Sequence, residues 1–306
     1  MIRTAFAALF TLSTAAPSLG GEVRSYTSQV NDVDAVNSHW VETDNGVILI
    51  DAQRILPEAE RALEHLQAST GKPVIAIFVT HPHTDHYGGL PVWVEAYPEA
   101  TVYMTAVTML SIREDSRGYN TARAERHRER FASQSALDRA LTNVTVVANG
   151  ERLAIDGTEI ALRVFGPSEA ESTLVIELEN TEQIFVGDLI NVGVPAVPFE
   201  SLENWLSQLS ELEALYATAQ LYQGHGPAPI EISEVAEQRR FLIALRDLVA
   251  ERTADNFLSA ADRAEVVFAL EAGWPFHAGV AGNTRREILA FDAGLAAEQM
   301  GATVEE

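Results

Sequence analysis

One stretch, residues 74–89, constrains this chain more than any other part of its sequence. It begins with an apolar, β-branched run over residues 74–79, which is typical of a buried strand. Four side chains of metal-ligand type then fall within six positions, namely His81, His83, Asp85 and His86. A regular helix or strand would not point all four at one place, whereas a tight loop can, and Pro82, Gly88 and Gly89 favour a loop. The stretch therefore predicts a metal-binding loop at the end of a buried strand.

The motif His81-x-His83-x-Asp85-His86 after a hydrophobic strand resembles the signature of the metallo-β-lactamase superfamily. The resemblance covers about residues 35–230, because similar pieces occur in the same order upstream, at residues 46–51, and downstream, at residues 185–188 and 224–226. It implies an α+β fold of the αββα type, a four-layer sandwich of two sheets between helices. It also implies a metal-dependent hydrolase.

Two further ligand candidates lie at the ends of later predicted strands. Asp188 follows residues 185–187, and His225 lies between Gly224 and Gly226, which allow the backbone to approach a site closely. The resemblance makes Asp188 the carboxylate that bridges two metal ions. It makes His225 a ligand of the second ion.

The sequence departs from the family pattern at one ligand position. The family places a histidine shortly before the strand predicted at residues 172–178, where this chain has no histidine. Counting back from Asp188 puts Glu169 at that position, and alkyl sulfatases of the same superfamily carry a glutamate in a similar segment. A carboxylate can ligate zinc, so we expect Glu169 to be a ligand. Glu171 is the alternative, as is a merely acidic loop with one metal bound elsewhere.

We therefore expect two metal sites, with Asp188 bridging them. The first would hold its ion with His81, His83 and Glu169, and the second with Asp85, His86 and His225. The expected cofactors are two divalent ions, zinc in the first place, although the extra carboxylate could favour manganese or iron. Asp51, at the end of the strand predicted at residues 47–50, would lie behind the metal loop according to the resemblance, or act as a turn cap.

A pair of ions about 3.5–4 Å apart would share a water and lower its pKa towards neutrality. The resulting hydroxide would attack an ester, lactone, thioester or amide, a β-lactam included, with Asp85 and Asp188 as the catalytic carboxylates. Tyr87 and Tyr222 are weaker candidates for substrate contacts, with packing as the alternative. The alternative functions are an alkyl-sulfatase-like hydrolase, an iron-dependent oxidoreductase of the same fold and a non-catalytic metal-binding protein.

Composition limits the partners and the chemistry. The formal charge of −23, with a single lysine (Lys72), argues against nucleic acid and anionic lipid but does not by itself reveal a substrate. The partner expected of a hydrolase is a small-molecule substrate. The absence of cysteine excludes thiolate ligands and disulfides. Hydrophobic residues make up 47% of the chain and charged residues 21%, which is typical of a globular protein. The oligomeric state is left open.

Residues 1–20 are predicted to be a secretory signal, with Arg3 as a basic start, an apolar core over residues 5–12 and a cleavage site near Gly20. A disordered N-terminus is the alternative. The mature protein would then be periplasmic or secreted, without a membrane span. Residues 21–306 are predicted to form one metallo-β-lactamase-like domain with a helical insertion near residues 106–142 and C-terminal helices over residues 232–300.

Within that insertion, residues 121–141 are predicted to form one charged helix. Its mixed charges favour a solvated face, and a substrate lid is the alternative.

Overall fold

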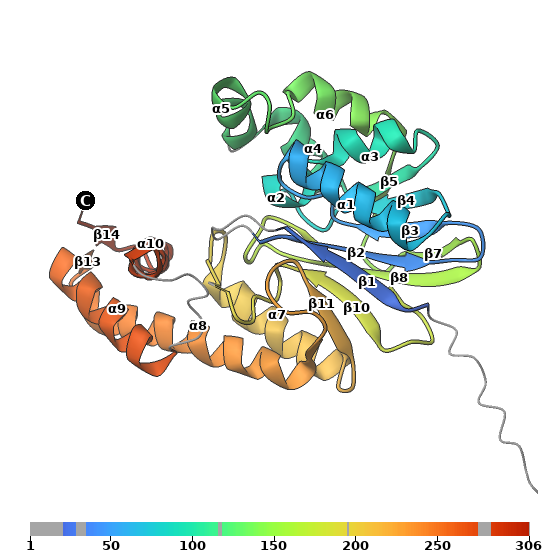
Figure 1. Ribbon diagram of the computed structural model, residues 1–306. Helices are drawn as coiled ribbons and strands as arrows, with labels where there is room; N and C mark the ends of the chain where they lie inside the picture. Colours follow the sequence, from blue (N-terminus) through green and yellow to red (C-terminus); the bar gives the residue numbers. More distant parts are fainter. Residues whose placement is uncertain (1–20, 29–34, 116–117, 195, 275–282, 306) are drawn as a thin grey trace, which may run out of the picture.

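The computed structural model describes residues 21–28, 35–115, 118–194, 196–274 and 283–305. Two six-stranded sheets follow one another along the chain (Figure 1). The first contains, in spatial order, β1 (Val23–Thr27), β2 (Asn37–Glu42), β3 (Val47–Ile50), β4 (Val74–Phe78), β5 (Thr101–Thr105) and β6 (Val144–Val147). The second contains β12 (Ile230–Glu231), β11 (Gln220–Gln223), β10 (Gln183–Gly187), β9 (Thr173–Leu178), β8 (Thr158–Phe165) and β7 (Arg152–Ile155).

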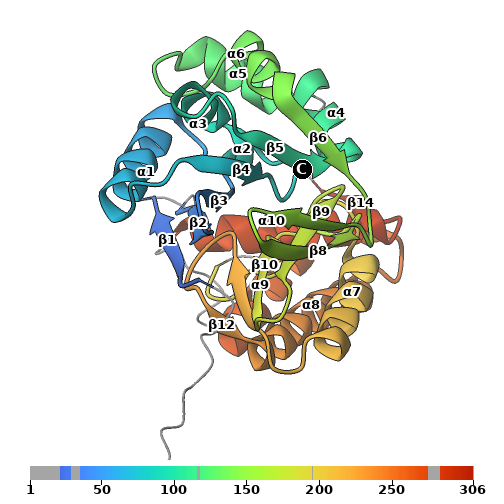
Figure 2. The same cartoon turned by 90° about the vertical axis from the view of Figure 1, so that its right-hand side faces the viewer.

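Helices cover the outer face of each sheet (Figures 1 and 2). The first half carries α1 (Leu56–Ser69), α2 (Thr84–Tyr87), α3 (Leu90–Ala96), α4 (Ala106–Glu114), α5 (Tyr119–Arg126), α6 (Gln134–Ala140) and the short 3-10 helix Leu141–Asn143. The second half carries α7 (Leu202–Leu215), α8 (Ile232–Arg252), α9 (Ala260–Gly273) and α10 (Asn283–Gln299). A small parallel pair, β13 (Phe257–Leu258) and β14 (Thr303–Val304), lies beside α10.

Alternation along the strands produces the four layers. In β3, Ile48 and Ile50 point into the core between the sheets, where they join Phe78, Ile176 and Phe185. The intervening residues of the same strand, Val47 and Leu49, point the other way and pack with the helices of the first half. A third cluster joins the second sheet to α7, α8, α9 and α10. The predicted αββα sandwich is confirmed.

The prediction of one helix over residues 121–141 is wrong. The segment contains part of α5 and then α6, because α5 ends at Arg126, with His127 as its C-cap, and a new helix begins after Ser133. The Ser133 side chain accepts a hydrogen bond from the Ala136 N–H, which is the N-cap arrangement that serine favours. The charged sequence concealed this cap.

Strand β7 (Arg152–Ile155) was not expected either, since a four-residue run gives a weak alternation signal. The predicted signal, residues 1–20, lies outside the described residues. Among the helices that the structure describes, none combines the length and the apolar character that crossing a membrane requires.

Candidate metal centre

The predicted metal-binding segment follows the carboxyl end of β4; His81 and His83 lie in the loop after this strand, and Asp85 and His86 lie in α2. Strands β3 and β4 are parallel, so their carboxyl ends bring residues 51–54 against the loop. Gly88 and Gly89 make this approach possible, although neither has a positive φ. A Cβ atom would lie 2.1 Å from the Arg54 carbonyl oxygen at Gly88 and 2.2 Å from the Ala52 carbonyl oxygen at Gly89. These glycines are therefore needed for close packing and not for a turn.

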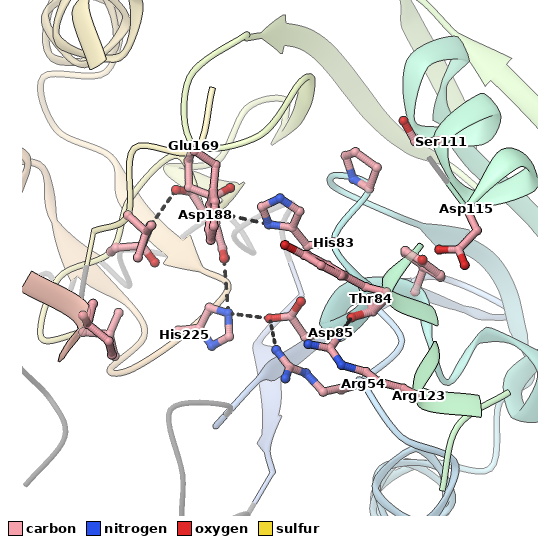
Figure 3. A pocket seen from close by; sticks show the side chains of 18 residues that line it. Arg54, His83, Thr84, Asp85, Ser111, Asp115, Arg123, Glu169, Asp188 and His225 are labelled. Atoms are coloured by element: carbon pink, nitrogen blue, oxygen red, sulfur yellow. Dashed lines mark hydrogen bonds and ion pairs between the residues drawn. The ribbon is translucent and has the colours of Figure 1, made fainter. Parts of the chain in front are cut away.

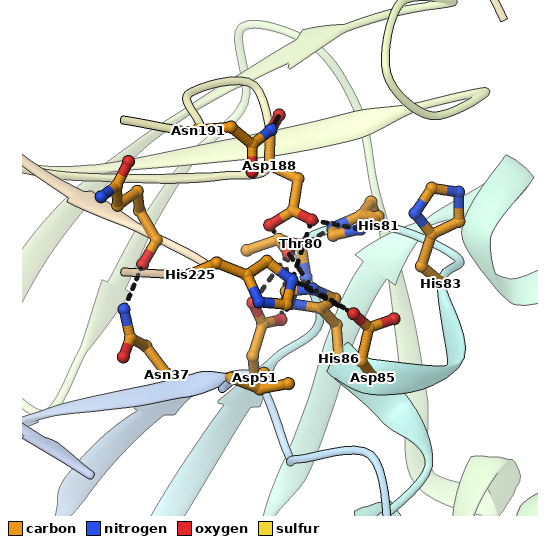
Figure 4. A network of polar contacts seen from close by, with 12 residues as sticks. Asn37, Asp51, Thr80, His81, His83, Asp85, His86, Asp188, Asn191 and His225 are labelled. Carbon is orange, nitrogen blue, oxygen red and sulfur yellow. Dashed lines mark hydrogen bonds and ion pairs between the residues drawn. The ribbon is translucent and has the colours of Figure 1, made fainter. Parts of the chain in front are cut away.

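The predicted ligands come together in two clusters that share Asp188 (Figure 4). One contains His81, His83, Glu169 and Asp188, and the other contains Asp85, His86, Asp188 and His225. In each cluster the candidate ligand atoms lie within 4.8 Å of one another. His83 Nδ1 is 3.1 Å from Glu169 Oε1, and His225 Nε2 is 3.1 Å from Asp85 Oδ2 and 3.2 Å from Asp188 Oδ2. All seven residues are buried or half-buried.

Parallel strands of the second sheet position the later ligands. Asp188 follows β10, and His225 follows the neighbouring parallel strand β11. At Gly224 an added Cβ would lie 2.1 Å from Asp188 Oδ1 and 2.6 Å from His86 Cε1. Only glycine leaves room for the two clusters to meet here.

The loop that carries His225 is also bound to the first sheet. Asn37 Nδ2 donates to the carbonyl oxygens of Gln223 and Gly226, each at 3.0 Å. His39 Nε2 lies 2.9 Å from the Gln223 carbonyl oxygen, and burial lowers the pKa of His39 to about 4, so a neutral ring donates this bond. The two halves of the sandwich therefore share the positioning of His225.

Contacts behind the ligands direct the histidine ring nitrogens towards the centre. His86 Nδ1 lies 2.8 Å from Asp51 Oδ2 and His225 Nδ1 lies 3.2 Å from the Ala35 carbonyl oxygen, so each Nδ1 donates and each Nε2 faces inward. Thr80 Oγ1 lies 2.9 Å from His81 Nδ1 and donates to Asp51, which orients His81 in the same way. Asp51 therefore contacts the metal loop from behind, as the resemblance implied.

The arrangement fits divalent metal ions. Nε2 of His86 and Nε2 of His225 face each other at 3.3 Å, where two lone pairs, or two N–H groups, would repel each other. His81 Nε2 and Glu169 Oε2 are buried 3.8 Å apart, and within the described part of the chain neither forms a hydrogen bond. Leaving such a buried group unsatisfied costs about 1–3 kcal/mol. A cation among these atoms would satisfy all of them, and nitrogen and oxygen donors suit zinc, manganese and iron.

Burial and nearby charges together set the pKa values of the side chains in both clusters. Burial alone would raise the pKa of Asp85, but the Arg54 guanidinium and His86 outweigh it and hold that pKa well below its usual range. Burial is likewise outweighed at Asp188, where His225 and His86 keep the pKa well below its usual range. Burial raises the pKa of Glu169, with His83 opposing it. Burial would lower the pKa of His225, but Asp188 and Asp85 raise it to about 10.

A pocket opens over both clusters (Figure 3). Its polar wall contains two arginines that the sequence did not single out. Arg54 Nη2 lies 3.2 Å from Asp85 Oδ2, and Arg123 Nη1 donates to Thr84 Oγ1 at 2.8 Å. The lining also includes apolar side chains, among them Val194, Val197, Phe199 and Ile288. Helix α5 thus contributes Tyr119 and Arg123 to the pocket, in keeping with the lid alternative for the charged segment.

The two tyrosine candidates occupy different environments. Tyr87 lines the pocket, and its role towards a substrate stays a prediction. Tyr222 is absent from the described lining; its ring packs between the sheets, with its centroid 5.1 Å from that of Phe185 and 5.5 Å from that of His39. The packing alternative therefore describes Tyr222, because its direction on β11 points it away from the pocket.

Comparison with known proteins gives one family. The chain is 24% identical over 248 residues to the atrochrysone carboxyl ACP thioesterase of Aspergillus fumigatus, covering 78% of this chain and 69% of that protein. It is 36% identical over 69 residues to an (R)-specific secondary-alkylsulfatase of Pseudomonas sp., covering 22% of this chain and only 10% of the sulfatase. A solved stereoselective inverting sec-alkylsulfatase from Pseudomonas sp. superimposes with a TM-score of 0.61 at 19% identity, over 93% of this chain and about half (52%) of the sulfatase.

The family sequence model of the metallo-β-lactamase superfamily matches residues 31–252 of this chain, and this range includes every ligand candidate of both clusters. With the αββα sandwich and the paired clusters described above, this match shows that the chain belongs to the metallo-β-lactamase superfamily and is an enzyme of its hydrolase type.

Proposed function

We propose that this chain is an exported hydrolase that holds two divalent metal ions, zinc in the first place, and cleaves a small-molecule ester, lactone, thioester or amide. The observation that carries the proposal is the position of Asp188, which belongs to both ligand clusters. A carboxylate that belongs to both clusters is what a pair of ions would require.

The chain's own residues have three tasks in this reaction. His81, His83, Glu169 and Asp188 would hold one ion, and Asp85, His86, His225 and Asp188 the other. When bound, such ions supply Lewis acidity and lower the pKa of water towards neutrality. Asp85 and Asp188 remain carboxylates at all ordinary pH values because their pKa values are held low, so both can accept protons in hydrogen bonds within the site. Apolar side chains of the lining, such as Phe199, would exclude water from part of the substrate.

An alkyl-sulfatase-like activity is the second candidate. Two observations favour it, namely the presence of Glu169 in the first cluster and the local sequence similarity to secondary- and primary-alkylsulfatases of Pseudomonas sp.. The similarity to a thioesterase favours acyl transfer to water instead. The two candidates require the same metal centre and differ in the group that the pocket must accept.

One experiment separates these alternatives from a binding protein. Purified chain would be analysed for metal content and then tested with p-nitrophenyl esters, lactones, a chromogenic cephalosporin, acyl thioesters and alkyl sulfates. We expect about two ions per chain and turnover that a chelator abolishes and added metal restores. A protein that keeps its activity after exhaustive metal removal, or that binds metal and turns over none of the five classes, would contradict the proposal.

A further inference from the structure

We infer that Arg123 recognises a carboxylate of the substrate, so that the preferred substrate is an organic anion whose charged group lies close to the bond that is cleaved. The inference rests on the proposed function and adds to it the substrate class. Arg123 is carried by α5 of the helical insertion, and its guanidinium reaches the polar wall of the pocket beside the metal loop (Figure 3).

Three contacts hold the guanidinium in place. Nη1 donates to Thr84 Oγ1 at 2.8 Å, and the guanidinium carbon lies 5.4 Å from the ring centroid of Tyr119 and 6.0 Å from that of Phe131. Thr84 is next in sequence to two ligand candidates, His83 and Asp85. The positive charge is thus fixed beside the clusters.

The charge of Arg123 has no counterion among the residues that the structure describes. Arg54, the other pocket arginine, forms an ion pair with Asp85. Asp115, a carboxylate that also lines the pocket, accepts hydrogen bonds from the backbone N–H groups of Asn120 and Thr121 and so caps α5. Arg123 is only half-buried, and among the described residues its guanidinium donates one hydrogen bond, to Thr84, although it carries five N–H groups.

An anion would suit this pocket despite the net charge of −23 for the whole chain. Two divalent ions would offset the negative charge of the cluster carboxylates, Asp85, Glu169 and Asp188, which would otherwise repel a substrate anion. Arg123 adds a permanent charge in a planar fork, which matches a carboxylate with two parallel hydrogen bonds. An apolar part of the same molecule would lie along Val197, Phe199 and Ile288, which line the same pocket.

Binding of a matched probe pair to the metal-loaded full-length chain tests this inference without depending on turnover. The probes are N-hexanoylglycine, which carries a carboxylate, and N-hexanoylglycinamide, its neutral twin, both titrated by calorimetry. Arg123→Gln removes the charge and Arg123→Lys keeps it without the fork. Arg126→Gln is the matched control, because Arg126 is on the same helix, is exposed and does not line the pocket.

We expect the ratio of acid to amide affinity to fall about tenfold in Arg123→Gln, partly in Arg123→Lys and not at all in Arg126→Gln. An unchanged ratio in Arg123→Gln, or an equal fall in Arg126→Gln, would overturn the inference. Circular dichroism checks that each variant is folded.

The proposed function is tested separately, by measuring the rates at which the chain hydrolyses mono-p-nitrophenyl glutarate and its neutral methyl ester. If the esters are hydrolysed and Arg123→Gln does not change the preference between them, the proposed hydrolase function is supported and the inference on Arg123 is contradicted. If neither ester is hydrolysed but the binding ratios are as expected, the inference on Arg123 is supported and the proposed hydrolase function is contradicted.

Discussion

His86 Nδ1 lies 2.8 Å from Asp51 Oδ2, and the same carboxylate accepts hydrogen bonds from the N–H and the hydroxyl of Thr80 (Figure 4). Asp51 has a positive φ of 61° and is buried, so its backbone is held in an unusual conformation directly behind the metal loop. Through Thr80 it also reaches His81 Nδ1. One carboxylate therefore orients a histidine in each of the two clusters.

Asp51→Asn should weaken metal binding without removing a ligand. The amide would no longer offer two acceptor oxygens to His86 and Thr80, and loss of such a contact typically costs 10–100-fold in metal affinity. Competition with a chelator would measure this. Asp44→Asn is the control, since Asp44 is exposed and belongs to neither cluster. Equal affinities for wild type and Asp51→Asn would contradict the assigned role.

Asp188→Ala should remove both metal ions, whereas Asp85→Ala should remove only one. The reason is that Asp188 is a member of both clusters and Asp85 of one. Elemental analysis of the two purified variants gives the stoichiometry, and the turnover of any substrate found should be lost in both. If Asp188→Ala retained one full equivalent of metal, Asp188 would not be a bridging ligand.

The extent to which the sequence could predict this centre depends on the distance between the residues that form it. A local motif contains His81, His83, Asp85 and His86, so these four ligands could be predicted from the sequence. Asp188 and His225 could be predicted because each follows the end of a strand. The position of Arg123 in the pocket could not be predicted, because its charged segment has the pattern of a solvated helix and because its contact partner, Thr84, is 39 residues away in the sequence. The break between α5 and α6 was missed because the Ser133 cap lies in the middle of the segment predicted as one helix.

Metal binding should release protons. In the metal-free chain His225 has a pKa raised from 6.5 to about 10, chiefly by Asp188 against burial, and the pKa of His86 is also raised well above 6.5. Both rings are therefore protonated at pH 7.5, and a metal must displace those protons. Calorimetric titration in buffers of different ionisation enthalpy would count about two protons. His225→Gln should release about one fewer; an identical count would contradict the assignment.

The same raised pKa values set the pH dependence of the metal-free fold. A group whose pKa is higher in the folded than in the unfolded chain stabilises the fold fully below its unfolded pKa, here 6.5, and this stability is lost as the pH rises towards about 10. The free energy of unfolding without metal should therefore decline over that range in chemical denaturation. A flat profile would argue against the protonated His225–Asp188 pair.

Export predicts a shortened N-terminus. If residues 1–20 act as a signal, expression in a bacterium with a periplasm should yield soluble mature protein beginning near Gly21. Mass spectrometry of the intact periplasmic protein measures this directly. A chain that keeps Met1 and is recovered from the cytoplasm would remove the basis for a periplasmic or secreted enzyme.

Glu169 provides the sharpest test of this metal centre, because it stands where the family usually has histidine. Its Oε1 lies 3.1 Å from His83 Nδ1, and its buried Oε2 faces His81 Nε2 at 3.8 Å. Glu169→Ala should therefore lose the ion of the first cluster. Glu171→Ala should cost much less, since Glu171 belongs to neither cluster. Glu169→His should recover binding and shift the preference towards zinc, because imidazole suits zinc and carboxylate suits harder ions. Metal content at one pH decides the question: wild-type stoichiometry in Glu169→Ala would mean that Glu169 is not a ligand.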